Sequence, residues 1–169
     1  MLERAFGVCR KSIGLLALLI VALAVTPNSI RAESVEESSD LVIDGSQLLY
    51  DLEAEDEYEN RMRSSYLYKG TVRITNNGNG YVGIYGSTDC YVDCDKVKTY
   101  IYLERSSGNG SFSSYRSWEY STTNTCTLSK SFSYPVEKGY YYRLRGYHSC
   151  TKNGVTENAG TCTNGIYIG

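Results

Sequence analysis

Apolar and polar residues alternate at period two over most of the C-terminal two thirds of this chain. The clearest pairs are Val72 with Ile74, Val82 with Ile84, and Ile101 with Leu103. Asn-Gly steps at 77–78 and 79–80 and a Gly-Asn-Gly step at 108–110 separate such runs with residues that tolerate positive φ. Because no helical periodicity of useful length competes, the pattern predicts half-buried strands and an all-β fold.

Seven short strands are expected, at about 66–75, 82–84, 97–103, 112–120, 128–136, 140–148 and 161–168. Seven strands at fairly even spacing predict an antiparallel two-sheet sandwich of the immunoglobulin or fibronectin type. In that sandwich the second strand pairs with the fifth, and the third lies beside the sixth. A small closed β-barrel is the alternative. If the sandwich has a tyrosine corner, strand parity favours Tyr140 or Tyr142 for it.

The N-terminus has the anatomy of a secretory signal peptide. Arg4, Arg10 and Lys11 precede an apolar run at 13–25, and Ala32 offers a small residue at a cleavage point. The run is short for a membrane-spanning helix, which needs about 20 residues. We therefore expect a signal peptide at 1–32, contact with the membrane only during export, and a mature protein that is secreted and extracellular.

Charge divides the rest of the chain into an acidic lead and a basic body. Residues 33–59 hold eleven Asp or Glu and no Lys or Arg, whereas residues 61–169 hold thirteen Lys or Arg against seven Asp or Glu. Acidic runs of this kind are most often solvated. We expect a flexible linker at 33–63 before a β domain at 64–169. The alternative is a pro-segment or clamp that lies on the basic domain until it is released.

Five cysteines follow the signal segment, and in an exported protein they favour disulfides. The sandwich topology gathers the loops that carry them at one end. The preferred pairing is Cys90 with Cys126 and Cys150 with Cys162, which leaves Cys94 unpaired. A rival pairing joins Cys94 to Cys150.

Cysteine and histidine could also suggest a metal centre or a catalytic thiol. Zinc sites usually show paired C-x-x-C spacings, and the single Cys90-x-x-x-Cys94 step matches that pattern weakly. The only histidine, His148, has no evident carboxylate to orient it beside Cys150, and we expect it to be packed. The sequence therefore predicts no metal, no cofactor and no catalytic residues.

Tyrosine is abundant, with seventeen in the chain, and its parity predicts a binding face. On neighbouring strands the outward positions form one surface of tyrosines crossed by arginines. Its members are Tyr100, Tyr102, Tyr141, Arg143, Arg145 and Tyr147. Amphipathic aromatics beside guanidinium groups suit sugar rings, peptides or partner proteins. Cross-strand stabilisation of an exposed sheet is the structural alternative.

Three stretches carry a family resemblance: 86–105, 139–148 and 157–166, with an Ile-Asp-Gly-Ser motif at 43–46 in the lead. They resemble a family of small exported proteins of Gram-positive gut anaerobes (Clostridia), which combine a signal peptide, a short acidic lead and one β domain. The resemblance implies export and a single β domain, and it brings no activity or site residues.

These observations favour a secreted, non-enzymatic binding module for an extracellular glycan, peptide or protein. The alternative is a small effector or inhibitor, bacteriocin-like, that is processed from its acidic lead. Nucleic acid is not expected as a partner, because the basic excess of the body is modest and spread out.

Overall fold

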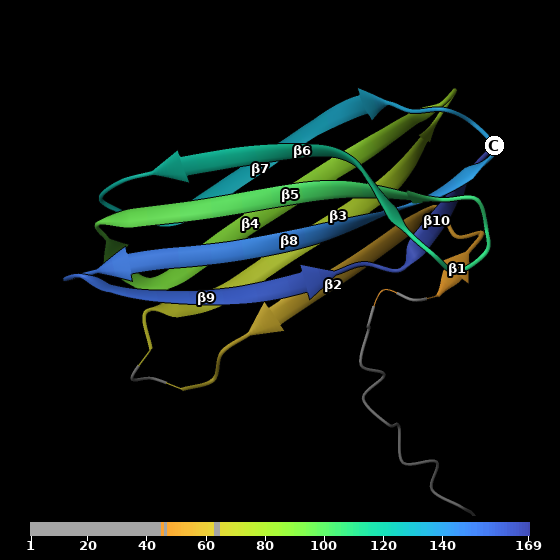
Figure 1. Cartoon of the computed structure of the whole chain (residues 1–169). Coiled ribbons are helices and arrows are strands. Elements are labelled where there is room, and N and C mark those ends of the chain that lie inside the picture. Colours follow the sequence, from red (N-terminus) through yellow and green to blue (C-terminus); the bar gives the residue numbers. More distant parts are fainter. Residues whose placement is uncertain (1–44, 46, 63–64) are drawn as a thin grey trace, which may run out of the picture. The chain divides into compact units, whose positions relative to one another are not determined.

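The computed structural model of the chain describes residues 45, 47–62 and 65–169, and these form strands joined by turns (Figure 1). The signal peptide predicted at 1–32 lies outside the described residues. No helix in the described part has the length and apolar character needed to cross a membrane. The strands are β1 (Leu48–Leu49), β2 (Glu53–Glu59), β3 (Leu67–Gly78), β4 (Tyr81–Cys94), β5 (Lys96–Ser106), β6 (Ser113–Thr122), β7 (Thr125–Pro135), β8 (Tyr140–Lys152), β9 (Val155–Cys162) and β10 (Gly165–Ile168).

The strands form two packed sheets, which confirms the predicted all-β sandwich rather than the closed alternative. One sheet has the order β2-β3-β4-β7, and the other has the order β1-β10-β8-β5-β6, with β9 also pairing with β8. The expected partnerships of the second strand with the fifth, and of the third with the sixth, are β4 with β7 and β5 with β8.

The last predicted strand, at 161–168, is divided between two strands. β9 and β10 both pair with the edge of β8 away from β5, β10 at 140–142 and β9 at 145–152. The reason is the position of the hairpin turn. Asn153 and Gly154, at φ 51° and 78°, close a tight β8–β9 turn that the sequence analysis had placed in a longer loop.

The acidic lead contributes two strands, so the fold begins before the boundary predicted at residue 64. β1 pairs with β10 in parallel, and β2 pairs with β3 over its full length, from Glu53 opposite Thr75 to Glu59 opposite Lys69. Ion pairs join the two strands: Lys69 Nζ lies 2.5 Å from Glu57 Oε2, and Arg73 Nη1 lies 3.4 Å from Glu55 Oε2. Residues 47–59 are thus part of the sandwich, not a flexible linker.

Both sheets bury the alternating residues that the sequence pattern identified. Val72, Ile74, Val82 and Ile84 from one sheet meet Ile101, Leu103, Leu144, Ile166 and Ile168 from the other. Tyr142 is fully buried among them, and its hydroxyl donates to the carbonyl of Glu137 at 2.8 Å. This is the backbone contact of a tyrosine corner, at one of the two positions that parity favoured.

Trp118 on β6 is partly buried against this core. Its ring meets Phe132 and Tyr134 of β7 edge to face, with centroids 5.0 and 5.1 Å apart. β6 is hydrogen-bonded to β5 in the six-stranded sheet, so this aromatic contact joins the two sheets.

Candidate functional site

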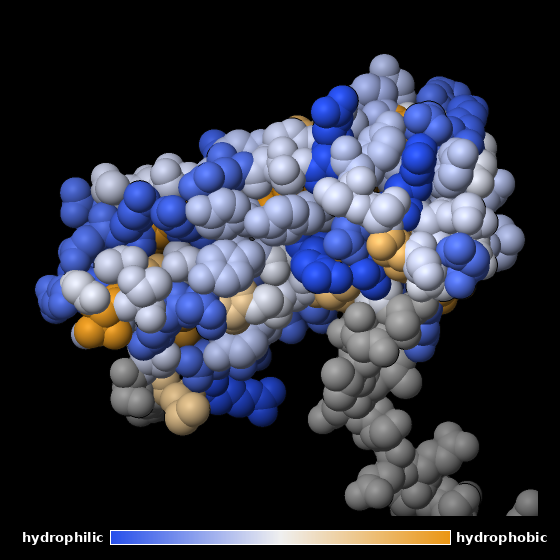
Figure 2. Space-filling view, viewed as in Figure 1, coloured by the Kyte–Doolittle hydropathy of each residue, from blue (hydrophilic) through white to orange (hydrophobic). Residues whose placement is uncertain are grey.

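The outer face of the six-stranded sheet carries all six residues of the predicted binding surface. Its inward neighbours Ile101, Leu103, Tyr142 and Leu144 have no exposed surface, so period two directs the alternate residues outward. The register places Tyr100 opposite Tyr147, Tyr102 opposite Arg145, and Glu104 opposite Arg143. Figure 2 shows this face as mostly of intermediate hydropathy, with strongly hydrophilic groups gathered near its middle.

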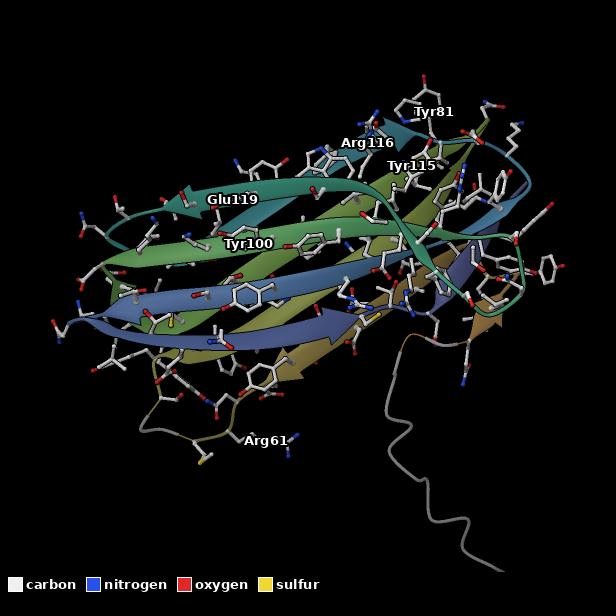
Figure 3. The ribbon with its side chains drawn as sticks, in the orientation of Figure 1. Arg61, Tyr81, Tyr100, Tyr115, Arg116 and Glu119 are labelled. Carbon is white, nitrogen blue, oxygen red and sulfur yellow. The ribbon has the colours of Figure 1, made fainter. Side chains whose placement is uncertain are left out.

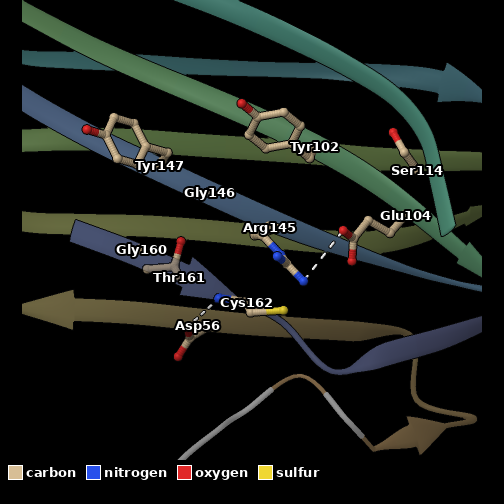
Figure 4. Close-up of a pocket in the computed structure, with 10 residues that line it drawn as sticks. All are labelled: Asp56, Tyr102, Glu104, Ser114, Arg145, Gly146, Tyr147, Gly160, Thr161 and Cys162. Carbon is tan, nitrogen blue, oxygen red and sulfur yellow. Dashed lines mark hydrogen bonds and ion pairs between the residues drawn. The ribbon is translucent and has the colours of Figure 1, made fainter. Parts of the chain in front are cut away.

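An open groove of about 800 Å³ crosses this face (Figure 4). Three of the predicted residues line it: Tyr102, Arg145 and Tyr147. Asp56, Glu104, Ser114, Gly146, Gly160, Thr161 and Cys162 complete the lining. The groove therefore combines two aromatic rings with carboxylate, guanidinium and hydroxyl groups from β2, β5, β6, β8 and β9.

Glu104 is the electrostatic centre of the groove. Its Oε2 accepts a hydrogen bond from Arg143 Nε at 2.7 Å, and its Oε1 lies 3.6 Å from Arg145 Nη2. The side chains of Glu104 and Arg143 are 15% and 12% exposed, whereas that of Arg145 is 53% exposed. Arg145 is thus the guanidinium that a ligand can reach.

Arg143 is not among the residues that line the groove, and its guanidinium contacts other parts of the fold. Besides the bond to Glu104, its Nη1 donates to the Gly45 carbonyl at 2.6 Å, and the group lies 4.1 Å from the Phe112 ring centroid. Arg143 therefore lies outside this groove, and its role in binding stays a prediction. Arg143 fastens residue 45 and Glu104 to the sheet.

Two of the predicted tyrosines also lie outside the groove lining. Tyr100 stands edge to face with Tyr147, with centroids 5.7 Å apart, and its hydroxyl donates to Glu119 at 2.8 Å (Figure 3). Tyr141 packs instead against Tyr50 and Tyr167, with centroids 5.8 and 5.2 Å apart. Tyr100 therefore supports a groove ring from the side, and Tyr141 belongs to a separate aromatic cluster.

The sequence of this chain matches one family model over residues 32–166. The chain belongs to DUF6147, a family of unknown function. No curated protein matches it. The family description assigns no activity to the DUF6147 domain, so the chemistry of the site rests on its own residues.

Asp56 is a groove residue that the sequence analysis did not select. Its Oδ2 accepts a hydrogen bond from the Cys162 amide at 2.7 Å. Burial raises the pKa of Asp56, although the bonds from the amides of Cys162 and Glu57 oppose that rise. It was missed because the acidic lead was interpreted as a linker. The signal available was its place in the alternating run at 53–59.

Cys162 also lines the groove. Burial raises the pKa of its thiol, and the nearby Arg143 and Arg145 offset that rise only in part. The structure also excludes the predicted Cys150–Cys162 disulfide. On the β8–β9 hairpin Cys150 lies opposite Glu157 and Cys162 opposite Arg145, so five residues of strand separate the two thiols.

Three other cysteines gather at one end of the interior. The thiols of Cys90, Cys94 and Cys150 all lie within 4.8 Å of one another, and we call these three residues the sulfur cluster. Cys126 is half-buried and packs against the same apolar group. No disulfide joins any of the five described cysteines in this structure, the predicted Cys90–Cys126 pair included. The rival pair, Cys94 and Cys150, is brought together.

His148 lies between the sheets and outside both the groove and the sulfur cluster. Its Nδ1 is 3.0 Å from Thr88 Oγ1, and its Nε2 is 2.8 Å from Thr161 Oγ1. Burial lowers the pKa of His148 to about 4. With both ring nitrogens engaged by hydroxyl groups, the imidazole is a packed residue, as the sequence analysis expected.

Proposed function

We propose that this protein is an exported, non-enzymatic binding module that holds an uncharged glycan in the groove. The observation that carries the proposal is the pairing of Tyr102 and Tyr147 with Arg145 in one open groove of about 800 Å³. The two rings are 36% and 39% exposed, which leaves flat apolar area for a ligand. Sugar rings match such a surface because they present both apolar C–H faces and hydroxyl groups.

The charges of the groove favour a ligand without net charge. Arg145 is balanced by Glu104, and Asp56 adds a second acidic group whose pKa is raised by burial. An anionic ligand would meet these carboxyl groups, and a cationic one would meet Arg145. Ligand hydroxyl groups can donate hydrogen bonds to the carboxyl groups and accept them from Arg145. The polar lining therefore suits sugar hydroxyls better than a charged peptide.

A binding role fits the groove better than hydrolysis, although two carboxyl groups line it. Both oxygens of Glu104 face arginine nitrogens, and Asp56 Oδ2 accepts the Cys162 amide. A general base or nucleophile needs an available oxygen beside the reacting atom. In this structure these oxygens are engaged by arginine nitrogens and by a backbone amide of the protein itself.

Export is part of the proposal and rests on the sequence. The basic N-terminus, the apolar run at 13–25 and Ala32 have the order of a secretory signal, and the family match begins at residue 32. The resemblance to exported proteins of Gram-positive anaerobes supports the same setting. The proposed glycan is then one met outside the cell.

The test is binding of the mature protein to an array of uncharged polysaccharides and oligosaccharides, followed by calorimetry on the hits. Tyr102→Ala combined with Arg145→Ala is expected to weaken binding tenfold or more while leaving the Tm nearly unchanged. Tyr81→Ala is the matched control, because Tyr81 is 46% exposed on β4 of the other sheet (Figure 3).

Three outcomes would overturn the proposal. Equal losses in the groove variant and in Tyr81→Ala would place binding elsewhere. A large fall in Tm for the groove variant would make these residues structural. Release of reducing ends from a bound glycan would make the protein a hydrolase.

A further inference from the structure

The sulfur cluster is buried in apolar surroundings where the two sheets meet. Cys90, Cys94 and Cys150 are 9%, 1% and 0% exposed. They pack with Leu67, Val97 and Leu128 from three different strands. Three thiols within 4.8 Å of one another need only small side-chain shifts to bring two sulfurs to bonding distance. The cluster is therefore a site for covalent chemistry that is separate from the groove.

We propose that Cys90 and Cys150 form a disulfide that links the two sheets, and that Cys94 remains a buried thiol beside it. The bond rests on the proposed export, because disulfides persist in oxidising compartments. It is independent of what the groove binds. It also replaces the pairings that the sequence favoured.

The choice of pair follows from the places of the three residues in the fold. Cys90 lies on β4 of the four-stranded sheet, and Cys150 lies on β8 of the six-stranded sheet. Cys94 ends β4, and its thiol donates to the Val92 carbonyl at 3.4 Å. A disulfide sulfur has no proton to donate, so bonding Cys94 would break this contact. Pairing the other two residues preserves it.

The bond would also constrain the unfolded chain strongly. Cys90 and Cys150 close a loop of about 60 residues, and the entropic stabilisation by a disulfide grows with loop length. A Cys90–Cys94 bond would close only a short loop within β4. A bond from β4 to Cys150 on β8 therefore stabilises the sandwich more than a bond within β4.

Formation of the bond is an oxidation of the exported chain before the cluster is buried, by an external disulfide that is either a small-molecule disulfide or a thiol–disulfide oxidase. One cysteine thiolate attacks that disulfide, which releases one donor thiol and leaves a mixed disulfide. The second thiolate then attacks the cysteine sulfur of the mixed disulfide, and the other donor thiol leaves. The two cysteines lose two electrons and two protons, and the donor disulfide is reduced to two thiols.

A thiolate metal centre is the rival use of the cluster. Metal binding requires the thiols to lose their protons. Burial raises the pKa of Cys150 to about 12, and burial also raises that of Cys90. A disulfide removes both protons and leaves no charge in the apolar interior. The surroundings of the cluster therefore favour the bond.

The decisive experiment is peptide mapping of the mature protein recovered from culture medium, alkylated and digested without reductant. Trypsin alone leaves Cys90 and Cys94 on one peptide, because no Lys or Arg separates them. Adding a protease that cleaves before aspartate gives peptides 89–92 and 93–94, each with one cysteine. Cys150, Cys126 and Cys162 then lie on 146–152, 117–130 and 153–169. The expected result is a linked pair of 89–92 with 146–152.

A thermal measurement gives an independent test. Reductant should lower the Tm of the wild-type protein by about 10 °C or more. The Tm of Cys94→Ala should fall by the same amount on addition of reductant, because this variant leaves the bonded pair intact. Cys90→Ala combined with Cys150→Ala should abolish it.

Three results would overturn the inference. Peptide 93–94 linked to 146–152 would assign the bond to Cys94. An alkylating label on all three cysteines of the cluster would show that no bond forms. Stoichiometric zinc released on thiol modification would establish the metal centre. Mapping of the wild-type protein decides the question even if a variant does not fold.

Discussion

At the scale of single residues, His148 shows how the two sheets accommodate a titratable group. Gly70 on β3 and Gly146 on β8 make room for its ring, since a Cβ at either position would come within 3 Å of an imidazole atom. Thr88 and Thr161 satisfy the two ring nitrogens. Protonation would place a charge in this enclosed space. The imidazole is therefore held neutral, and its pKa falls from 6.5 to about 4.

This pKa predicts that stability falls as the solution is acidified. The unfolded chain takes up the proton near pH 6.5, and the folded chain near pH 4. Between these values the unfolded state binds more protons, so the stabilisation is complete above pH 6.5 and is lost below pH 4. We expect the free energy of unfolding to fall by about 2 kcal/mol from pH 7.5 to pH 5. Urea unfolding at the two pH values measures it.

His148→Gln is the control for this prediction. Glutamine cannot take up the proton, so the variant should show little change between pH 7.5 and pH 5, whatever stability it loses overall. If the free energy of unfolding falls equally in both proteins between pH 7.5 and pH 5, other groups cause the pH dependence.

At the scale of elements, β2 shows why the sequence pattern can fail to predict a strand. Acidic residues occupy its alternate positions from Glu53 to Glu59, and Ala54 is the buried residue between the first two. Isolated, such a segment has little apolar surface and strong self-repulsion. In the fold, Lys69 and Arg73 of β3 compensate its charge. Its strand structure depends on the partner, which composition does not reveal.

Glu157 on β9 fastens the start of β3 to the opposite sheet. Its Oε2 accepts hydrogen bonds from the amides of Tyr66 and Leu67 at 2.8 Å each, and from the Ser65 hydroxyl at 2.5 Å. Burial acts to raise the pKa of Glu157, but these three bonds outweigh it and lower the pKa. The carboxylate thus holds the connection between β2 and β3.

Glu157→Ala should therefore destabilise the protein and expose this connection. Loss of an acceptor shared by three donors is expected to cost about 1–3 kcal/mol. Tryptic cleavage after Arg61, which is exposed on the connection, should become several-fold faster (Figure 3). Glu137→Ala is the matched control. Glu137 is 61% exposed in its ion pair with Arg105, and removing it should change stability by less than about 1 kcal/mol. Unchanged cleavage in Glu157→Ala would contradict this role.

At the scale of the whole molecule, the alternation of apolar and polar residues predicted which side chains point inward. It did not predict the features that depend on strand register or on which strands pair. The inward positions of Ile101 and Leu144 followed from alternation, as did the outward position of Tyr102. The distance between Cys150 and Cys162 depends instead on which residues form the turn, and the Asn153-Gly154 pair was the signal for it. The sequence predicted only some of the residues that line the groove, because Asp56 on β2 is far from the others in the sequence.

The two strands of the lead make the limits of the domain testable. A chain that starts at residue 65 loses β1 and β2, which leaves the edge of β3 unpaired and removes Ala54 from the core. We expect this chain to lose 10 °C or more in Tm, or to be insoluble. A chain that starts at Gly45 keeps both strands and the carbonyl that Arg143 binds, and it should match the mature protein. Thermal unfolding of the two chains, produced in parallel, makes the comparison.

The same comparison separates the two functional hypotheses. An effector released by cleavage near Arg61 would have to remain folded without β2, and the groove would lose Asp56. A binding module keeps the strand, because β2 completes both the sheet and the groove. If the chain from residue 65 is as stable as the longer one, β2 is dispensable and processing from the acidic lead becomes the better account. If it is not, the acidic segment at 47–59 belongs to the working form of the protein.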